Sequence, residues 1–337
     1  MDVPSKYKNL TERIFSVNQN HFDELAIDIF NFQYTNNVMY QSYCDALKTN
    51  PSLVQEINQI PFLPIQFFKN RAIRTTDFIP EITFESSGTT GAVTSKHEIK
   101  DLNIYEESFM KCFELFYGDV SNYCVIGLLP SYLERKNSSL VYMVNKLIKN
   151  CNYKNSGFYL NEFEALKKVL EENESQEIKT LLIGVSYALL DFSEQFAMKL
   201  KCTTIMETGG MKGRREELSR EKLHEHLKTN LGETEIHSEY GMTELLSQAY
   251  SKGKGIFNCP PWMKILLRAG DDPFEILEDF SKTTYQTGGV NIIDLANINS
   301  CCFIATEDAG KTYANGSFEI TGRLEHSDIR GCGLMIL

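Results

Sequence analysis

The chain has 337 residues, of which 42% are hydrophobic and 23% charged, and its formal net charge is −11. These values are typical of a folded globular protein and exclude a largely disordered chain. The acidic balance argues against nucleic acid as a partner, because phosphate backbones are bound by surplus lysine and arginine.

The sequence favours neither a membrane protein nor a disulfide-stabilised protein. No apolar run approaches the roughly 20 residues of a membrane span, and the polar start of the chain lacks the apolar core of a signal peptide. We therefore expect a cytoplasmic protein. The nine cysteines are scattered and include no C-x-x-C pair, which favours neither a disulfide framework nor a zinc site.

The N-terminal part is expected to be helical. Residues 7–48 carry apolar side chains at spacings of three and four, among them Phe22, Leu25 and Ile29, which would form one buried face. Residues 60–68 contain two prolines, which break a helix and lead the chain into a polar loop.

That loop, within residues 84–101, has the composition of a phosphate-binding segment. Its glycines allow tight turns, so backbone N–H groups and hydroxyls could surround an anion, and a lysine adds positive charge. It is not a Walker A loop, because the lysine comes five residues after the second glycine. The alternative is a flexible surface turn. The residues concerned are Ser86, Ser87, Gly88, Thr89, Thr90, Gly91 and Lys96.

The central part alternates between helix and strand patterns. Residues 103–117, 138–149, 163–170 and 187–200 have helical spacing, and residues 123–129, 180–185 and 203–207 have the pattern of buried strands. Such alternation predicts a mostly parallel sheet with helices on its faces and ligand sites beyond the carboxyl ends of the strands.

Two motifs stand at such strand ends. Residues 208–215, TGGMKGRR, combine Gly209 and Gly210, which let a flat ligand approach the backbone, with three basic residues. Residues 236–248, IHSEYGMTELLSQ, offer a ring, a tight bend, a hydroxyl and a carboxylate. Each motif alone also fits an ordinary turn. The residues of the second motif are Tyr240, Gly241, Thr243 and Glu244.

The C-terminal part is rich in short strand patterns, at residues 263–267, 274–277, 290–295, 301–306 and 317–321. Asp294 lies late in one of them, and Arg323 follows the last. We predict an α/β fold with mixed or parallel sheets and flanking helices, organised as a helical region (1–59), an α/β nucleotide-binding core (60–250) and a smaller β-rich part with a C-terminal tail (251–337).

The motifs taken in order resemble those of the AMP-forming adenylating enzymes. Within that superfamily the sequence resembles the acyl-protein synthetases of the LuxE type, through SSGTTG with SKH, LLPSYLERKNSSLVYM, ETGGMKGRR, EYGMTELLSQAY and GRLEHSDIRGCGLM. The resemblance runs from about residue 60 to the end. It implies ATP and Mg²⁺ as cofactors, a carboxylic acid as substrate and an acyl reductase as protein partner.

The resemblance also implies residue roles. Residues 86–91 and Lys96 would hold the ATP phosphates, while Gly209, Gly210 and Tyr240, with Gly241 at the bend, would bracket adenine. Thr243 would meet the α-phosphate and Glu244 would bind Mg²⁺. Asp294 and Arg323 would contact the ribose hydroxyls.

One departure from the superfamily concerns the second half-reaction. Adenylating enzymes usually continue past the GR motif into a small domain with a catalytic lysine, and this chain ends fourteen residues after Arg323. The LuxE-type enzymes instead pass the acyl group to a cysteine near the C-terminus, and Cys332 in RGCGLM is placed for that role. Arg330 would favour its thiolate, and His326 is a candidate base.

Alternative functions stay open at this point. The acid is expected to be a long-chain fatty acid, although a short or aromatic acid fits the related phenylacetate-type CoA ligases. The chain could be such a CoA ligase that uses a separate C-terminal domain, or a catalytically silent nucleotide-binding protein. His97, beside Lys96, could orient an anion or lie on the surface.

Overall fold

A computed structural model describes residues 2–86, 93–129, 137–209, 218–232, 235–281 and 283–324. The chain divides into two compact units, and the first is assembled from both ends of the sequence, residues 1–79 and 261–337. The second unit is continuous, from Pro80 to Pro260. The N-terminal helices therefore belong to the same unit as the C-terminal strands.

The second unit is built on a mixed sheet with the strand order β10-β9-β8-β7-β6-β4-β5. Its central strands, from β5 to β8, run parallel, whereas β9 and β10 pair antiparallel. The strands are β4 (Cys124–Leu128), β5 (Gly157–Phe158), β6 (Thr180–Val185), β7 (Thr203–Thr208), β8 (His237–Tyr240), β9 (Ala249–Ser251) and β10 (Phe257–Asn258).

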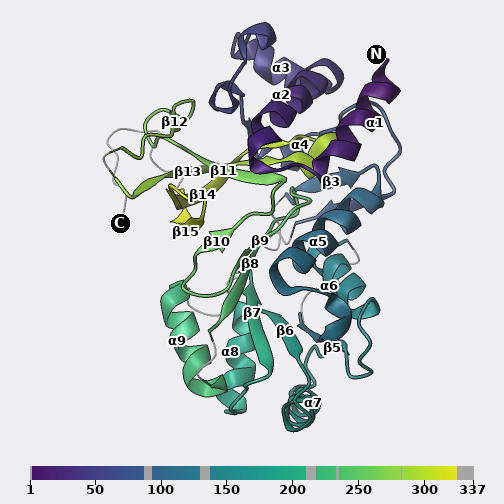
Figure 1. The fold of residues 1–337 in the computed structure, drawn as a ribbon, viewed down its shortest axis with the longest axis vertical. Coiled ribbons are helices and arrows are strands. Elements are labelled where there is room, and N and C mark those ends of the chain that lie inside the picture. Colours follow the sequence, from purple (N-terminus) through teal and green to yellow (C-terminus); the bar gives the residue numbers. More distant parts are fainter. Residues whose placement is uncertain are drawn as a thin grey trace. The chain divides into compact units, whose positions relative to one another are not determined.

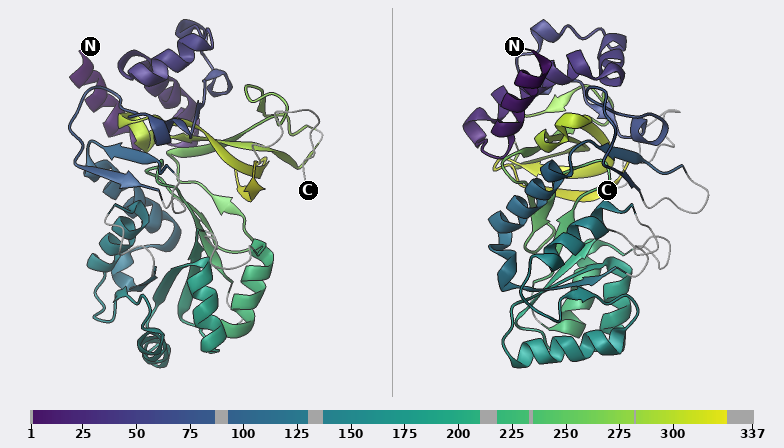
Figure 2. Two further views of the ribbon diagram at one scale, coloured as in Figure 1. Left: turned by 180° about the vertical axis from the view of Figure 1, so that it is seen from behind. Right: turned by 90° about the vertical axis from the view of Figure 1, so that its right-hand side faces the viewer.

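Helices cover both faces of this sheet. Figures 1 and 2 show α5 and α6 on one side of the parallel strands and α8 and α9 on the other. Every residue of β4 and β6 is buried, as expected for parallel strands covered on both faces. The helices are α5 (Leu102–Tyr117), η3 (Val120–Asn122), α6 (Ser139–Lys149), α7 (Phe163–Ser175), α8 (Ser186–Gln195) and α9 (Arg220–Leu231).

The first unit contains antiparallel strands in the order β12-β11-β13-β14-β15, with β1 parallel to β14. The strands are β1 (Leu63–Pro64), β11 (Met263–Arg268), β12 (Ile276–Leu277), β13 (Tyr285–Asp294), β14 (Phe303–Tyr313) and β15 (Phe318–Arg323). Its helices are α1 (Val3–Ile14), α2 (Gln19–Asn36), α3 (Val38–Ala46), η1 (Pro51–Leu53), η2 (Ile57–Gln59), α4 (Phe67–Asn70) and η4 (Leu295–Asn299).

The glycine pair within β13, Gly288 and Gly289, is explained by the close approach of the backbone and of the buried guanidinium of Arg268. Arg268 donates hydrogen bonds to the carbonyl oxygens of Val290 and Thr306, at 2.9 and 2.6 Å. A Cβ atom on Gly289 would lie 2.8 Å from Arg268 Cζ, and one on Gly288 would lie 2.3 Å from the Arg268 carbonyl oxygen. Only glycines leave room for Arg268 to fasten β13 to β14.

Helix α2 is attached to η4 and the turn after it through one buried amide. Gln33 is fully buried, and its Nε2 donates to the carbonyl oxygens of Asn297 and Ile298 at 3.0 and 3.1 Å. Its Oε1 accepts a hydrogen bond from the backbone N–H of Cys302 at 2.9 Å. This single side chain satisfies backbone groups that water does not reach.

Replacing Gln33 by leucine should therefore destabilise the first unit by about 2–4 kcal/mol, because several buried polar groups lose their partner. Urea unfolding followed by fluorescence measures this directly, since the only tryptophan, Trp262, is 4% exposed and lies in the same unit. Gln19→Leu, at the exposed first residue of α2, is the matched control. Equal unfolding midpoints for the two variants would contradict the assignment.

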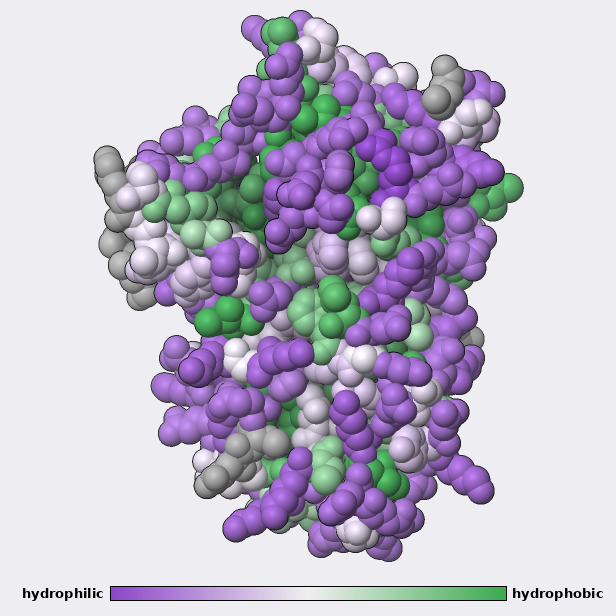
Figure 3. Space-filling model, viewed as in Figure 1, coloured by the Kyte–Doolittle hydropathy of each residue, from purple (hydrophilic) through white to green (hydrophobic). Residues whose placement is uncertain are grey.

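The predicted helices and strands are largely confirmed. The expected helical stretch at residues 7–48 is divided into α1, α2 and α3. The alternating central elements lie where the sequence places them, except that the helix expected at residues 187–200 ends at Gln195. The fold is a mixed α/β fold with parallel and antiparallel strands. Hydrophilic residues cover most of the face shown in Figure 3. Within the described ranges, no helix is both long and apolar enough to span a membrane.

Candidate functional site

The described part of the predicted phosphate segment forms a hairpin. Strands β2 (Ile82–Glu85) and β3 (Lys96–Ile99) pair antiparallel. The Ser86 N–H donates to the Ser95 carbonyl at 3.0 Å, and the Ser95 N–H donates to Ser86 Oγ at 2.9 Å. Ser87, Gly88, Thr89, Thr90 and Gly91 lie outside the described residues, so their role in binding phosphate stays a prediction.

Lys96 lies at the first position of β3, opposite Glu85. Its Nζ is 3.9 Å from Glu85 Oε1, and its side chain is 61% exposed. An exposed pair at this distance contributes little to stability. Lys96 is therefore exposed to solvent, and its role in binding phosphate stays a prediction.

His97 connects the hairpin to the segment that follows β8. Its side chain is 1% exposed, and its Nδ1 lies 2.9 Å from the carbonyl oxygen of Thr243. Because a carbonyl only accepts hydrogen bonds, Nδ1 must carry the proton. Burial lowers the pKa of His97 to about 4, so the imidazole is neutral at neutral pH. His97 is thus a buried link between two predicted nucleotide segments, not a surface residue.

A second link joins the carboxyl end of β7 to β8. Thr208 and Glu239 are directly opposite in the parallel register, and Thr208 Oγ1 donates to Glu239 Oε2 at 2.5 Å. A Cβ atom on Gly241 would lie 2.4 Å from Glu239 Oε1. A larger residue at the glycine of the Y-G-M-T-E motif would therefore displace this carboxyl group.

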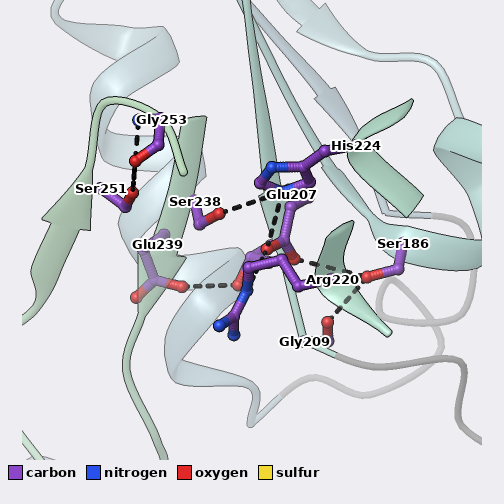
Figure 4. Close-up of polar contacts among 10 residues, drawn as sticks. Ser186, Glu207, Gly209, Arg220, His224, Ser238, Glu239, Ser251 and Gly253 are labelled. Carbon is purple, nitrogen blue, oxygen red and sulfur yellow. Dashed lines mark hydrogen bonds and ion pairs between the residues drawn. The ribbon is translucent and has the colours of Figure 1, made fainter. Parts of the chain in front are cut away.

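Gly209 follows β7 with φ of +66°, a backbone conformation that favours glycine. Its carbonyl accepts a hydrogen bond from Ser186 Oγ, at the start of α8, at 2.8 Å (Figure 4). The geometry of the chain at Gly209 is therefore fixed by a neighbouring element. Gly210 lies outside the described residues.

Glu207 is buried beneath this strand end and meets two groups of α9. Its Oε1 lies 3.3 Å from Arg220 Nε and 3.6 Å from His224 Nε2 (Figure 4). Ser238 Oγ lies 3.4 Å from the same nitrogen of His224. In a serine hydrolase triad the acid and the serine bond opposite ring nitrogens, so these residues do not form one.

Tyr240 ends β8 and is 9% exposed. Its ring lies 5.9 Å from that of Phe257, and the Arg220 guanidinium lies 5.1 Å from the Phe257 ring centre. Phe257 therefore contacts both an aromatic ring and a cation, which anchors Tyr240 at the strand end.

Thr243 and Glu244 follow in a turn closed by a hydrogen bond from the Leu245 N–H to the Met242 carbonyl at 3.1 Å. Thr243 is partly exposed, whereas Glu244 is 6% exposed. The carbonyl of Thr243 is held by His97, so this turn is fastened to β3.

The remaining predicted residues of the described chain belong to the first unit. Asp294 has no exposed surface, and its Oδ1 accepts a hydrogen bond from the Ala296 N–H at 3.1 Å, so it caps η4. Arg323 is opposite Asp308 in the register of β14 and β15, and its Nε lies 3.8 Å from Asp308 Oδ1. Asp308 is thus a carboxylate beside Arg323 that the sequence motifs did not indicate.

Cys332 and His326 lie outside the described residues, so their roles stay predictions. The sequence reasoning also missed Glu207 and Glu239, although both lie within the quoted motifs ETGG and EYGMTE. The sequence feature that could have indicated them is a glutamate directly before the threonine or tyrosine that ends a buried strand. Burying a carboxylate is costly, which marks such positions as structurally or functionally required.

Comparison with solved structures places this architecture among known folds. The ATP-bound MatB from Rhodopseudomonas palustris matches 72% of this chain and 47% of its own length, with 14% identity and a TM-score of 0.52. An ATP-bound chimera of RpMatB and BxBclM gives the same coverage and identity with a TM-score of 0.50. The chain thus spans about half the length of these structures, and the likeness concerns the fold.

The sequence comparisons are more specific. A search of curated proteins finds no significant match. A family described as "Acyl-protein synthetase, LuxE" matches residues 14–337, nearly the whole sequence. The chain therefore belongs to the LuxE acyl-protein synthetase family.

Proposed function

We propose that this protein uses ATP to convert a carboxylic acid into an acyl adenylate with release of pyrophosphate. Family membership supports this activity. The structural observation that carries the proposal is a pair of hydrogen bonds within one unit, one buried and one part-buried. The bond from His97 to Thr243 and the bond from Thr208 to Glu239 link the described parts of three predicted nucleotide segments.

The chemistry follows from the weakness of a carboxylate as an acyl donor. An oxygen of the acid attacks the α-phosphorus of ATP, and the bond from that phosphorus to the pyrophosphate oxygen breaks. The acyl group is then bonded to AMP, a far better leaving group than oxide. Catalysis of this step depends mainly on positioning and on neutralising phosphate charge.

The proposed residue roles follow the motifs. Residues 86–91 and Lys96 hold the phosphates, residues 209–210 with Tyr240 and Gly241 bracket adenine, and Thr243 contacts the α-phosphate. Arg323 contacts the ribose together with a carboxylate. The motifs predict Asp294 for this carboxylate, and Asp308, which lies opposite Arg323 in the register of β14 and β15, is a second candidate.

Magnesium fits this donor set. Mg²⁺ is usually held by one or two carboxylates together with substrate phosphate oxygens. Glu244 provides a buried carboxylate, and no group of three or more potential metal ligands occurs among the described residues. Such an ion would be held largely by ATP itself, and when bound it would neutralise phosphate charge.

The second half-reaction is proposed to occur on the protein. The Cys332 thiolate attacks the carbonyl carbon of the acyl adenylate, the bond to the phosphate oxygen breaks, and AMP leaves a thioester behind. His326 would accept the thiol proton. A fatty acid as substrate and an acyl reductase as final acceptor complete the proposal.

A pyrophosphate-release assay with ATP, Mg²⁺ and a panel of acids tests the first half-reaction. We expect release that depends on the acid, with long-chain fatty acids among the active ones. ATP binding without acid-dependent release would instead identify a silent nucleotide-binding protein. Release that requires coenzyme A and is unaffected by Cys332→Ala would identify a CoA ligase.

A further inference from the structure

Glu239 is a buried carboxyl group that the proposed chemistry does not use. It is 8% exposed, and its Oε2 accepts the hydrogen bond from Thr208 Oγ1 at 2.5 Å. Within the described ranges, its Oε1 accepts no hydrogen bond, and it lies 2.4 Å from where a Cβ on Gly241 would be. The carboxyl group thus lies between the end of β7 and the turn after β8.

The surroundings of Glu239 contain one other carboxyl group. This is Glu207 on β7, which is near enough to act on Glu239 electrostatically. The titratable groups that face Glu239 from α5 and β9 are phenols: Tyr105 and Tyr117 on α5, and Tyr250 on β9. Burial raises the pKa of all three tyrosines, so they stay neutral at neutral pH. No lysine or arginine acts on Glu239 among these neighbours.

Burial raises the pKa of Glu239 to about 7. The hydrogen bond from Thr208 lowers this pKa, whereas the negative charge of Glu207 raises it. The group therefore changes its charge within the range in which enzymes work. A carboxylate here places a negative charge next to Thr208 and Gly241, at the two segments proposed to bracket the nucleotide.

We propose that Glu239 couples nucleotide binding to proton uptake: its neutral carboxyl group adds no negative charge beside Thr208 and Gly241, where the anionic nucleotide is proposed to bind, whereas its carboxylate repels the nucleotide and weakens binding. This inference rests on the proposed function, because that function places the nucleotide at these segments.

The direction of the pH effect follows from linkage. A bound phosphate favours the neutral carboxyl group and so raises the pKa of Glu239 further. Affinity is then highest below pH 7 and falls as the pH rises through the pKa of the free protein. An increase of one pKa unit on binding corresponds to a loss of about tenfold in affinity at high pH.

The probe for this effect should not titrate itself. Adenosine 5′-(methyl phosphate) is suitable, because as a phosphodiester it has lost the second ionisation that a phosphate monoester undergoes near pH 6. Calorimetric titrations of the full-length protein from about pH 6 to about pH 9 should show binding that weakens by about tenfold, with a midpoint near pH 7. The variant Glu239→Gln, which keeps a neutral side chain, should show no such transition.

Thr208 provides a readout that a purely structural role of Glu239 would not produce. Its hydrogen bond lowers the pKa of Glu239, so Thr208→Val should move the midpoint to higher pH, while the matched variant Thr208→Ser should leave it in place. An unchanged pH dependence in Glu239→Gln, or an unmoved midpoint in Thr208→Val, would overturn this inference and leave the proposed function standing. Failure of the wild-type protein to bind the probe and ATP at any pH would overturn both the inference and the proposed function.

Discussion

Replacing Cys332 by alanine should abolish covalent acyl labelling of the protein while leaving acyl-AMP formation intact. Adenylation requires only the nucleotide and acid sites, whereas thioester formation requires the thiol. The measurement is a denaturing gel of protein incubated with ATP, Mg²⁺ and radiolabelled fatty acid, combined with an assay of pyrophosphate release. The wild-type label should be released by neutral hydroxylamine, as thioesters are.

Burial disfavours several of the described cysteines as the acyl acceptor, and a partly exposed one supplies a control. Cys44, Cys301 and Cys302 are fully buried, and burial raises the pKa of Cys44 to about 12, which suppresses its thiolate. Cys151 is partly exposed, so Cys151→Ala is the matched variant and should keep the label. A Cys332→Ala band as strong as that of wild type would contradict the transfer mechanism.

The label should also increase with pH. The thiolate is the attacking species, and an unperturbed thiol has a pKa of about 8.5, which a neighbouring Arg330 would lower. Initial labelling rates in wild type should therefore rise from neutral pH toward that pKa. A rate that does not change with pH would argue against a thiol nucleophile.

Glu244→Gln should reduce acid-dependent pyrophosphate release by roughly 100-fold or more. Losing a preorganised charge at a reacting phosphate typically costs this much. Because the proposed role is Mg²⁺ binding, the Mg²⁺ concentration needed for half-maximal activity should also rise. Both quantities come from one assay repeated over a range of Mg²⁺ concentrations.

Glu235→Gln is the control for this experiment, because Glu235 is half exposed and forms a surface ion pair with Lys228 at 2.8 Å. It should release pyrophosphate at nearly the wild-type rate. Thermal unfolding of both variants shows whether a loss of activity comes from the missing Mg²⁺ ligand or from unfolding of the protein. Near-normal release from a folded Glu244→Gln protein would reject the metal-ligand assignment.

The elements predicted well from sequence are those that the local pattern determines. Strand β6 is buried on both faces, so its run of apolar residues is visible at once. Strands β13 and β14 are longer than predicted, since their outer halves contain residues such as Gly288 and Lys311. These residues have little strand preference of their own, and cross-strand pairing extends the ladder through them.

The candidate site also contains residues that the local sequence indicates and residues that only the fold brings together. The motifs indicated Tyr240, Thr243 and Glu244 because their side chains have recognisable chemistry. Asp308 escaped notice because its relation to Arg323 depends on the register of two strands, which the spacing of residues does not reveal. Glu239 was missed because its significance depends on burial and on a partner in another strand.

The discontinuous first unit has a consequence for synthesis on the ribosome. Its helices are made first, yet Gln33 finds its backbone partners only among residues 297–302. The intervening second unit, residues 80–260, takes roughly 10–40 s to translate at about 5–20 residues per second. During that interval the surfaces of α1 and α2 that pack against η4 remain uncovered. Nascent chains that end at residue 260 and continue in a linker long enough to carry that residue out of the ribosomal exit tunnel should therefore hold a folded second unit and protease-sensitive N-terminal helices, and should recruit chaperones through those helices.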